Sequence, residues 1–173
     1  MNPVIKNILV FLTLILVQVL VLKSVDIGFA NWWITPFFYI IFIIELPVRF
    51  NSSLALVLAA LMGILVDIFY NMPGFHMSAA VLTAFVRNYI ISLTAPREGF
   101  EPTARPNIKT IGLNKYLVYS GLLFLIYHLW FFIIEVFSFS NFLLRITQAL
   151  ASGLVALGLA VLFHFMFNKT KKY

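Results

Sequence analysis

Five ionisable side chains stand within or beside long apolar stretches of this 173-residue chain, namely Glu45, Asp67, Arg87, Glu135 and Arg145. A charge at the centre of a bilayer costs about 2.5–3.5 kcal/mol even on the mildest insertion scale, so such groups pair with one another or serve a site. Counting residues back from the intervening turn places Glu45 about one helical turn from Arg87. The same count places Glu135 beside Arg145. We therefore predict two structural ion pairs.

When the predicted helices are aligned at their connecting turns, no Lys or Arg side chain lies at the same depth as Asp67. The turn that follows it sets Asp67 about nine residues, or ~13 Å, from Arg87, which is too far for a salt bridge. The polar groups nearest its level are hydroxyls and imidazoles, from Ser78, His76 and His128. One interpretation is a carboxyl that is hydrogen-bonded across a seam between helices. The other is a carboxyl that contacts a ligand or a partner helix.

No catalytic pattern accompanies these charges. The sequence contains no HExxH, no GxSxG, no glycine-rich phosphate loop and no cysteine. Its three histidines, His76, His128 and His164, fall at different depths of their apolar stretches. We therefore expect a protein that is not an enzyme and that binds no metal or other cofactor.

The amino-acid composition indicates whether these residues lie in a soluble or a membrane protein. Hydrophobic residues make up 62% of the chain and charged residues 10%, whereas a soluble domain carries about a quarter charged residues. This excludes an ordinary soluble protein. The net charge of +6 is explained by basic residues in loops and tails, so membrane topology accounts for it better than binding to nucleic acid.

The apolar stretches predict an all-α integral membrane protein, a six-transmembrane-helix bundle in a single domain, 1–173. A hydrocarbon core of ~30 Å needs about twenty apolar residues per helix. The predicted spans are 7–22, 32–46, 54–70, 75–93, 116–137 and 142–167. The sequence Asn71-Met72-Pro73-Gly74 predicts a tight hairpin between the third and fourth spans. We interpret the first span as a retained anchor rather than a signal peptide, because Asp26 and bulky residues precede the nearest small residues.

The distribution of basic residues predicts that both termini are cytoplasmic. One side of the six-span model carries Lys6, Arg49, Arg97, Arg105, Lys109, Lys115, Lys169, Lys171 and Lys172, and the other carries Lys23 and Arg145. The cytoplasmic loop 94–115 is the longest polar segment. Its residues Arg105, Pro106 and Lys109 are expected to contact either anionic headgroups or a cytoplasmic partner.

Small residues recur at helical spacing on the third and fourth predicted spans. Such stripes let helix backbones approach closely in a membrane. We assign a helix-interface and partner-binding role to Ala55, Ala59, Gly63, Asp67, Gly74, Ala80, Thr83 and Arg87. Whether this seam is filled by the chain's own helices or by a partner's helix stays open at this point.

The stretch Gly63-Ile-Leu-Val-Asp67 is followed by Gly74, which gives a short G-x-x-x-D pattern with a following glycine. In this pattern the chain resembles the rod shape-determining protein MreD family, in particular the versions found in Bacteroidota. The loop 105–112 and the stretch 128–139 are further matches, and Arg145 and Ser152 extend the resemblance into the last span.

This resemblance implies a non-enzymatic subunit of the bacterial cell-elongation machinery for peptidoglycan synthesis, located in the cytoplasmic (inner) membrane. It implies binding to the bitopic protein MreC through transmembrane helices. It also implies cooperation with MreB, RodA and a class B penicillin-binding transpeptidase. The family is similar in fold to the S-components of energy-coupling-factor transporters, so a vitamin-type uptake subunit is the alternative function.

Overall fold

The computed structural model describes residues 3–24, 27–29, 32–95, 101, 103–135 and 142–167. Its elements are α1 (Pro3–Leu16), a π-helical turn (Val17–Val21), a 3-10 turn (Leu22–Ser24), β1 (Ile27–Phe29), β2 (Trp32–Ile34), a 3-10 turn (Phe38–Ile40), α2 (Ile41–Ile44), α3 (Ser52–Tyr70), α4 (Phe75–Thr94), α5 (Ile108–Ile111), α6 (Leu113–Glu135) and α7 (Phe142–Phe167).

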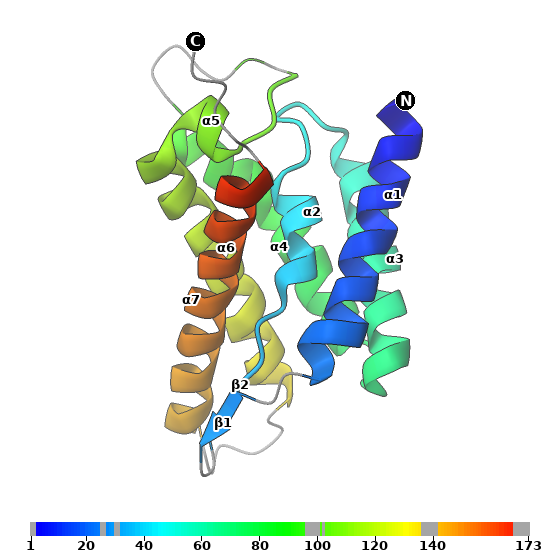
Figure 1. Ribbon diagram of the computed structural model, residues 1–173, viewed down its shortest axis with the longest axis vertical. Helices are drawn as coiled ribbons and strands as arrows, with labels where there is room; N and C mark the ends of the chain where they lie inside the picture. Colours follow the sequence, from blue (N-terminus) through cyan, green and yellow to red (C-terminus); the bar gives the residue numbers. More distant parts are fainter. Residues whose placement is uncertain are drawn as a thin grey trace.

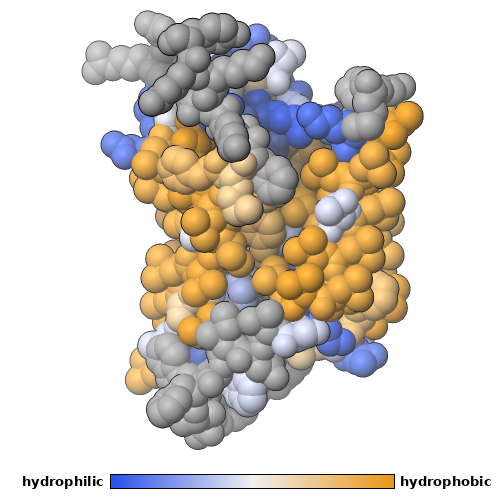
Figure 2. Space-filling view, viewed as in Figure 1, coloured by the Kyte–Doolittle hydropathy of each residue, from blue (hydrophilic) through white to orange (hydrophobic). Residues whose placement is uncertain are grey.

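Five helices are long and apolar enough to cross a membrane. They are Val4–Ser24, Ser52–Tyr70, Phe75–Thr94, Leu113–Glu135 and Phe142–Met166. They stand side by side along the long axis of the molecule (Figure 1). Apolar side chains cover the middle of the visible face, and hydrophilic residues gather at its two ends (Figure 2). Both features are those of an all-α multi-pass membrane protein.

The predicted hairpin is confirmed, and its ends follow from local sequence. Asn51 caps α3 by accepting a hydrogen bond from the backbone N–H of Leu54 at 3.0 Å. The helix ends where Asn71 adopts a left-handed conformation with φ of 55°, and Gly74, with φ of 89°, begins the approach to α4. The helices α3 and α4 then run antiparallel and pack against each other (Figure 1).

Three other predicted helices also agree with the structure. The first span corresponds to α1 with the two turns to Ser24, and the fifth and sixth spans correspond to α6 and α7. Residues 136–137 of the fifth span lie outside the described residues.

The prediction of a membrane-spanning helix over 32–46 is wrong. This segment begins as β2, which pairs antiparallel with β1, continues in extended form through Pro36, and only then forms short helical turns. Proline lacks a backbone N–H and holds the residue before it in extended conformation, so a helix cannot run through Thr35 and Pro36. Among the residues that the structure describes there are therefore five long helices and one broken segment rather than six transmembrane helices.

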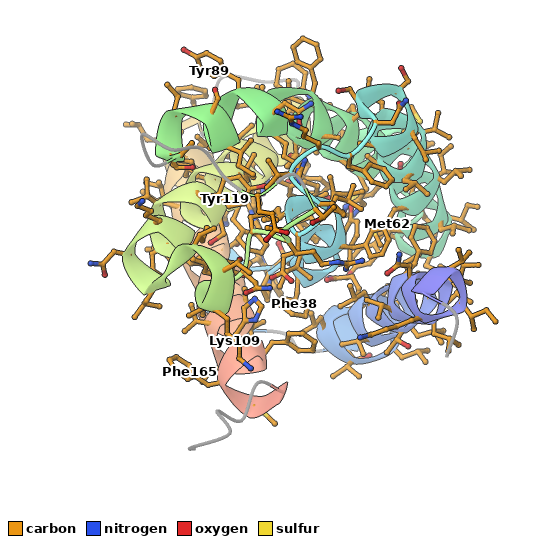
Figure 3. The ribbon with its side chains drawn as sticks, turned by 90° about the horizontal axis from the view of Figure 1, so that it is seen from above. Phe38, Met62, Tyr89, Lys109, Tyr119 and Phe165 are labelled. Atoms are coloured by element: carbon orange, nitrogen blue, oxygen red, sulfur yellow. The ribbon has the colours of Figure 1, made fainter. Side chains whose placement is uncertain are left out.

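The broken segment, which we define as residues 35–47, lies in the centre of the bundle. It passes from the β1–β2 end of the molecule to the α5 end, and α2 is enclosed by the five long helices (Figures 1 and 3). Every residue from Phe37 to Ile44 is buried. Non-helical backbone at membrane depth is tolerated only where protein encloses it, and this segment meets that condition.

The two ends of the bundle differ in charge. Pro3 of α1 and Phe167 of α7 lie at the α5 end (Figure 1). The described basic residues of that end are Lys6, Arg49, Arg105, Lys109 and Lys115, whereas Lys23 and Arg145 belong to the β1–β2 end. Arg97, Lys169, Lys171 and Lys172 lie outside the described residues. The charge asymmetry of the sequence thus coincides with the two ends of the structure.

Candidate functional site

Gln18 of the first helix satisfies much of the backbone that the broken segment leaves without helical partners. Its Oε1 accepts hydrogen bonds from the N–H groups of Phe38 at 2.9 Å and Tyr39 at 3.4 Å. Its Nε2 donates to the carbonyl of Pro36 at 3.3 Å and to Oη of Tyr70 at 3.1 Å. One side chain thereby holds the start of the helical turns in place.

Two further helices contribute single side chains to the same segment. Nε2 of His128, on α6, accepts from the N–H of Phe37 at 3.2 Å, and its Nδ1 bonds to the carbonyl of Phe124 at 2.7 Å. These roles are compatible with one neutral tautomer, protonated at Nδ1. Oγ of Ser152, on α7, accepts from the N–H of Thr35 at 3.1 Å. Side chains from distant parts of the sequence thus replace the missing helical hydrogen bonds.

A buried polar cluster of Tyr39, His76 and Tyr127 lies at the middle of the bundle. Nδ1 of His76 is 2.7 Å from Oη of Tyr127 and 3.3 Å from Oη of Tyr39, and the two hydroxyls also bond to each other. All three side chains are fully buried. In the described part of the chain, Nε2 of His76 has no hydrogen-bond partner. The rings of Phe37 and Phe131 lie 4.6 Å from its imidazole, centroid to centroid.

Arg87 closes the other end of the broken segment, so the predicted ion pair with Glu45 is wrong. Its Nε donates to the carbonyl of Ile44 at 3.3 Å, and its Nη2 donates to the carbonyls of Leu46 and Pro47. A guanidinium here satisfies carbonyls that a short helix leaves open at its C-terminus, and its positive charge suits that end of the helix dipole. Counting residues along the helices predicts the depth of Arg87 correctly, but its partners are backbone carbonyls and not the carboxylate of Glu45.

Glu45 instead connects the segment to α6 and α7. Its Oε1 accepts from Oη of Tyr116 at 3.0 Å and lies 2.6 Å from Nε2 of His164. Tyr119 completes this end by donating to the carbonyl of Ile44 at 2.7 Å. At this end of the segment, α4, α6 and α7 therefore each supply at least one polar contact.

The predicted pair of Glu135 and Arg145 is confirmed as an ion pair. Oε2 of Glu135 lies 3.5 Å from Nη1 of Arg145, at the β1–β2 end of α6 and α7. The contact lacks hydrogen-bond geometry, since Oε2 of Glu135 and Nε of Arg145 are buried without a hydrogen-bond partner among the described residues.

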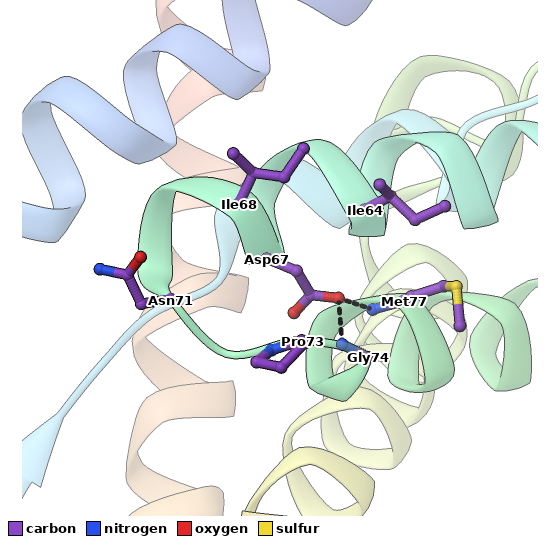
Figure 4. A pocket seen from close by; sticks show the side chains of 7 residues that line it. All are labelled: Ile64, Asp67, Ile68, Asn71, Pro73, Gly74 and Met77. Atoms are coloured by element: carbon purple, nitrogen blue, oxygen red, sulfur yellow. Dashed lines mark hydrogen bonds between the residues drawn. The ribbon is translucent and has the colours of Figure 1, made fainter.

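Asp67 binds backbone rather than a cation. Its carboxylate accepts from the N–H groups of Gly74 at 3.0 Å and Met77 at 3.1 Å (Figure 4). It also accepts from the N–H group of His76 at 2.9 Å. These are the free N–H groups of the first turn of α4, where a negative charge is favoured by the helix dipole. The hydrogen-bonded interpretation is therefore correct, but the donors are main-chain amides. Ser78 donates to the carbonyl of Phe75 instead.

The seam of small residues is filled by the chain's own helices. A Cβ atom added at Gly63 of α3 would lie 2.4 Å from Cα of Met77 of α4, so the two backbones touch at this point. The interface members Ala55, Ala59, Ala80, Thr83 and Arg87 are all buried. Of the two alternatives that the sequence left open for these residues, the structure shows the interface within the chain, because neighbouring parts of the bundle cover them.

A groove remains on the outside of the same hairpin. It has a volume of about 510 Å³ and lies between Ile64 and Ile68 of α3 and Met77 of α4, with Asp67 and Gly74 along its floor (Figure 4). Of the predicted partner-binding residues, these last two line a recess that another molecule could enter.

The predicted cytoplasmic contact loop is attached to the bundle. Its Ala104 carbonyl accepts from the N–H of Val48 at 2.9 Å, and Nη2 of Arg105 donates to Oδ1 of Asn7 at 2.8 Å. Pro106 is buried, whereas Arg105 and Lys109 are exposed. The two basic side chains therefore remain available for the headgroup or partner contact that the sequence predicts.

The sequence analysis does not identify several of the polar residues that hydrogen-bond to the broken segment or to one another. They are Gln18, Tyr39, Tyr70, Tyr116, Tyr119, Tyr127 and Ser152. A usable signal exists only for Gln18, because a glutamine in an apolar span needs a polar partner. In the described part of the chain, no group of three His, Asp or Glu side chains is placed to hold a metal ion.

No family model, curated protein or solved structure matches this chain.

Proposed function

We propose that this chain is a non-catalytic membrane subunit that binds the transmembrane helix of a bitopic partner in the groove beside Asp67. The partner is MreC, and the setting is the cell-elongation complex of a bacterial cytoplasmic membrane. The observation that carries the proposal is the structure of the α3–α4 hairpin, where the residues of the MreD-like signature fall together. Gly63 brings the helices into contact, Asp67 holds the start of α4, and Gly74 makes the turn.

The groove has the character of a helix-binding site in lipid. Its walls are apolar side chains from Ile64, Ile68 and Met77, and in a membrane such surfaces associate through close packing rather than through exclusion of water. Asp67 is 5% exposed, which leaves one edge of its carboxylate at the floor of the groove. A partner helix with a hydroxyl or amide at that level can donate to it.

The filled centre of the bundle favours a binding subunit over a vitamin-type uptake subunit. Tyr39, His76 and Tyr127 occupy the middle of the molecule as a closely bonded cluster. A vitamin site would need a roomy, convergent polar cavity. The charge distribution favours a cytoplasmic α5 end, so under this proposal the hairpin turn and the groove lie near the outer surface.

The test is co-purification with a tagged MreC protein, co-expressed and extracted in mild detergent. Ile68→Trp and Met77→Trp fill the groove and should reduce recovered MreC at least tenfold. Leu154→Trp is the matched control, because Leu154 is 68% exposed on α7 and Ile68 is 64% exposed on α3. The proposal is wrong if MreC is recovered equally with all three variants while each inserts normally into membranes.

Asp67→Asn separates the charge of the carboxyl from its shape. The amide oxygen can still accept from the first turn of α4, so the hairpin should form. If MreC binding is unchanged in this variant, the charge of Asp67 has no part in recognition and the apolar walls carry it.

A further inference from the structure

A second cavity opens at the β1–β2 end of the bundle, on the other side of the hairpin turn from the groove. Its volume is about 210 Å³, below the ~300–1,000 Å³ typical of sites for drug-sized ligands. It is walled by aromatic rings that include Trp33, Phe131 and Phe132. It therefore suits a molecule of about the size of a single amino acid.

The charged lining of this cavity is the ion pair of Glu135 and Arg145, and Thr35 and Tyr70 add hydroxyl groups. The side chain of Arg145 is 32% exposed and that of Glu135 is 27% exposed, so both can be reached from the cavity. Nη1 of Arg145 lies 3.5 Å from Oε2 of Glu135. Hydrogen bonds between a guanidinium and a carboxylate are usually shorter, at about 2.7–2.9 Å. Nη1 of Arg145 also donates to Oε1 of Gln148 at 3.2 Å, whereas Oε2 of Glu135 and Nε of Arg145 are buried with no hydrogen-bond partner among the described residues.

An unsatisfied pair of opposite charges selects for a ligand that carries both charges. A purely anionic ligand would be attracted to Arg145 but repelled by Glu135, and a cation would meet the reverse. A molecule with an acid group and an ammonium group a few bonds apart can bond to both without leaving either charge unpaired. An apolar side group would then pack on Phe131 and Phe132.

We infer that the cavity between β2, the end of α3, α6 and α7 binds a small zwitterion, with its acid group on Arg145 and its ammonium group on Glu135. Two sources share this chemistry: a free amino acid, and the ethanolamine phosphate headgroup of a lipid. The inference does not depend on the proposed MreC groove, since Asn71 and Pro73 line the groove whereas Tyr70 and Met72 line the cavity.

The protein in nanodiscs of phosphatidylglycerol, a lipid whose headgroup is not a zwitterion, provides the test. Calorimetric titration with L-phenylalanine should show saturable binding, and phenylacetate and phenethylamine, which each carry one charge, should bind at least tenfold more weakly. Native mass spectrometry after reconstitution in mixed lipid should show retained phosphatidylethanolamine if the headgroup is the ligand. The inference is overturned if neither L-phenylalanine binding nor retention of phosphatidylethanolamine is observed.

Variants distinguish binding from a structural role of the pair. Arg145→Gln and Glu135→Gln should each weaken zwitterion binding at least tenfold, and Arg105→Gln, an exposed change at the α5 end, should leave it unchanged. The exchange of both charges, Glu135→Arg with Arg145→Glu, should restore thermal stability but not binding, because the ends of the ligand then meet like charges. Binding that survives both glutamine variants, or returns fully with the exchange, refutes the assignment.

Discussion

Arg87 binds the carbonyl oxygen of Ile44, the residue directly before Glu45, and so closes the C-terminal end of α2. The guanidinium is 1% exposed and also donates to the carbonyls of Leu46 and Pro47. A buried cation is therefore used to end a helix of four residues inside the bundle. Arg87 thus satisfies carbonyl oxygens at the end of the broken segment.

Arg87→Met should destabilise the protein by about 2–3 kcal/mol, because several buried carbonyls lose a charged donor. Arg87→Lys keeps the charge but offers fewer directed donors, so its loss should be intermediate. The measurement is the midpoint of unfolding in detergent, followed by circular dichroism. Tyr89→Phe is the control, since Tyr89 is 68% exposed on the same helix. Equal midpoints for the methionine variant and the control would contradict the capping role.

Replacing Gln18 tests whether its side chain holds the backbone of the broken segment in place. Gln18→Leu should destabilise the protein by about 1–3 kcal/mol, because the N–H groups of Phe38 and Tyr39 lose their buried acceptor. Hydrogen–deuterium exchange at these two amides should become faster, while the amides in the middle of α6 keep their protection. Leu20→Ala, at a position that is 66% exposed, should change neither quantity. Unaltered exchange in the leucine variant would show that Gln18 is not needed to hold the segment.

The contrast between Gly63 and Gly158 tests the packing of α3 on α4. Gly63→Ala should destabilise the protein by about 1–3 kcal/mol, since its Cβ would collide with the backbone of Met77 at 2.4 Å. Gly158→Ala should cause no loss, because a Cβ there has no neighbour within 4 Å. Thermal unfolding of the two variants in one detergent gives the comparison. Equal stability of the two would mean that the α3–α4 contact is looser than the structure has it.

The sequence predicts the long helices well because their apolar runs are long and end at recognisable turn residues. It fails at the broken segment because apolar composition is the same for a lipid-facing helix and for a buried extended strand. Pro36 is the local warning. The groups that make the extended form tolerable, Gln18, His128 and Ser152, lie far away in the chain. A glutamine in an apolar span marks Gln18 as a residue that needs a partner, but no local pattern indicates that these three side chains bind the broken segment.

The sequence predicts how deep the side chains of the candidate site lie in the bundle, but not the direction in which each side chain points. Counting along helices places Glu45 and Arg87 at similar levels, yet it does not say which way each side chain points around the bundle axis. Glu135 and Arg145 meet as predicted, because adjacent ends of α6 and α7 leave little choice of direction. Asp67 shows the same limit, since only the folded turn brings three backbone N–H groups to its carboxylate.

The number of membrane crossings is decided by whether the broken segment carries the chain from one face to the other. The chain has no cysteine, so single cysteines can be introduced at Ser24 and Pro73, both exposed at the β1–β2 end. If the segment crosses, a membrane-impermeant maleimide added to intact spheroplasts should label both positions. Lys109→Cys, at the α5 end, should react only after the membrane is opened. Labelling of Ser24→Cys but not of Pro73→Cys would mean that residues 35–47 return to the face they left, and the cytoplasmic location of both termini would then be wrong.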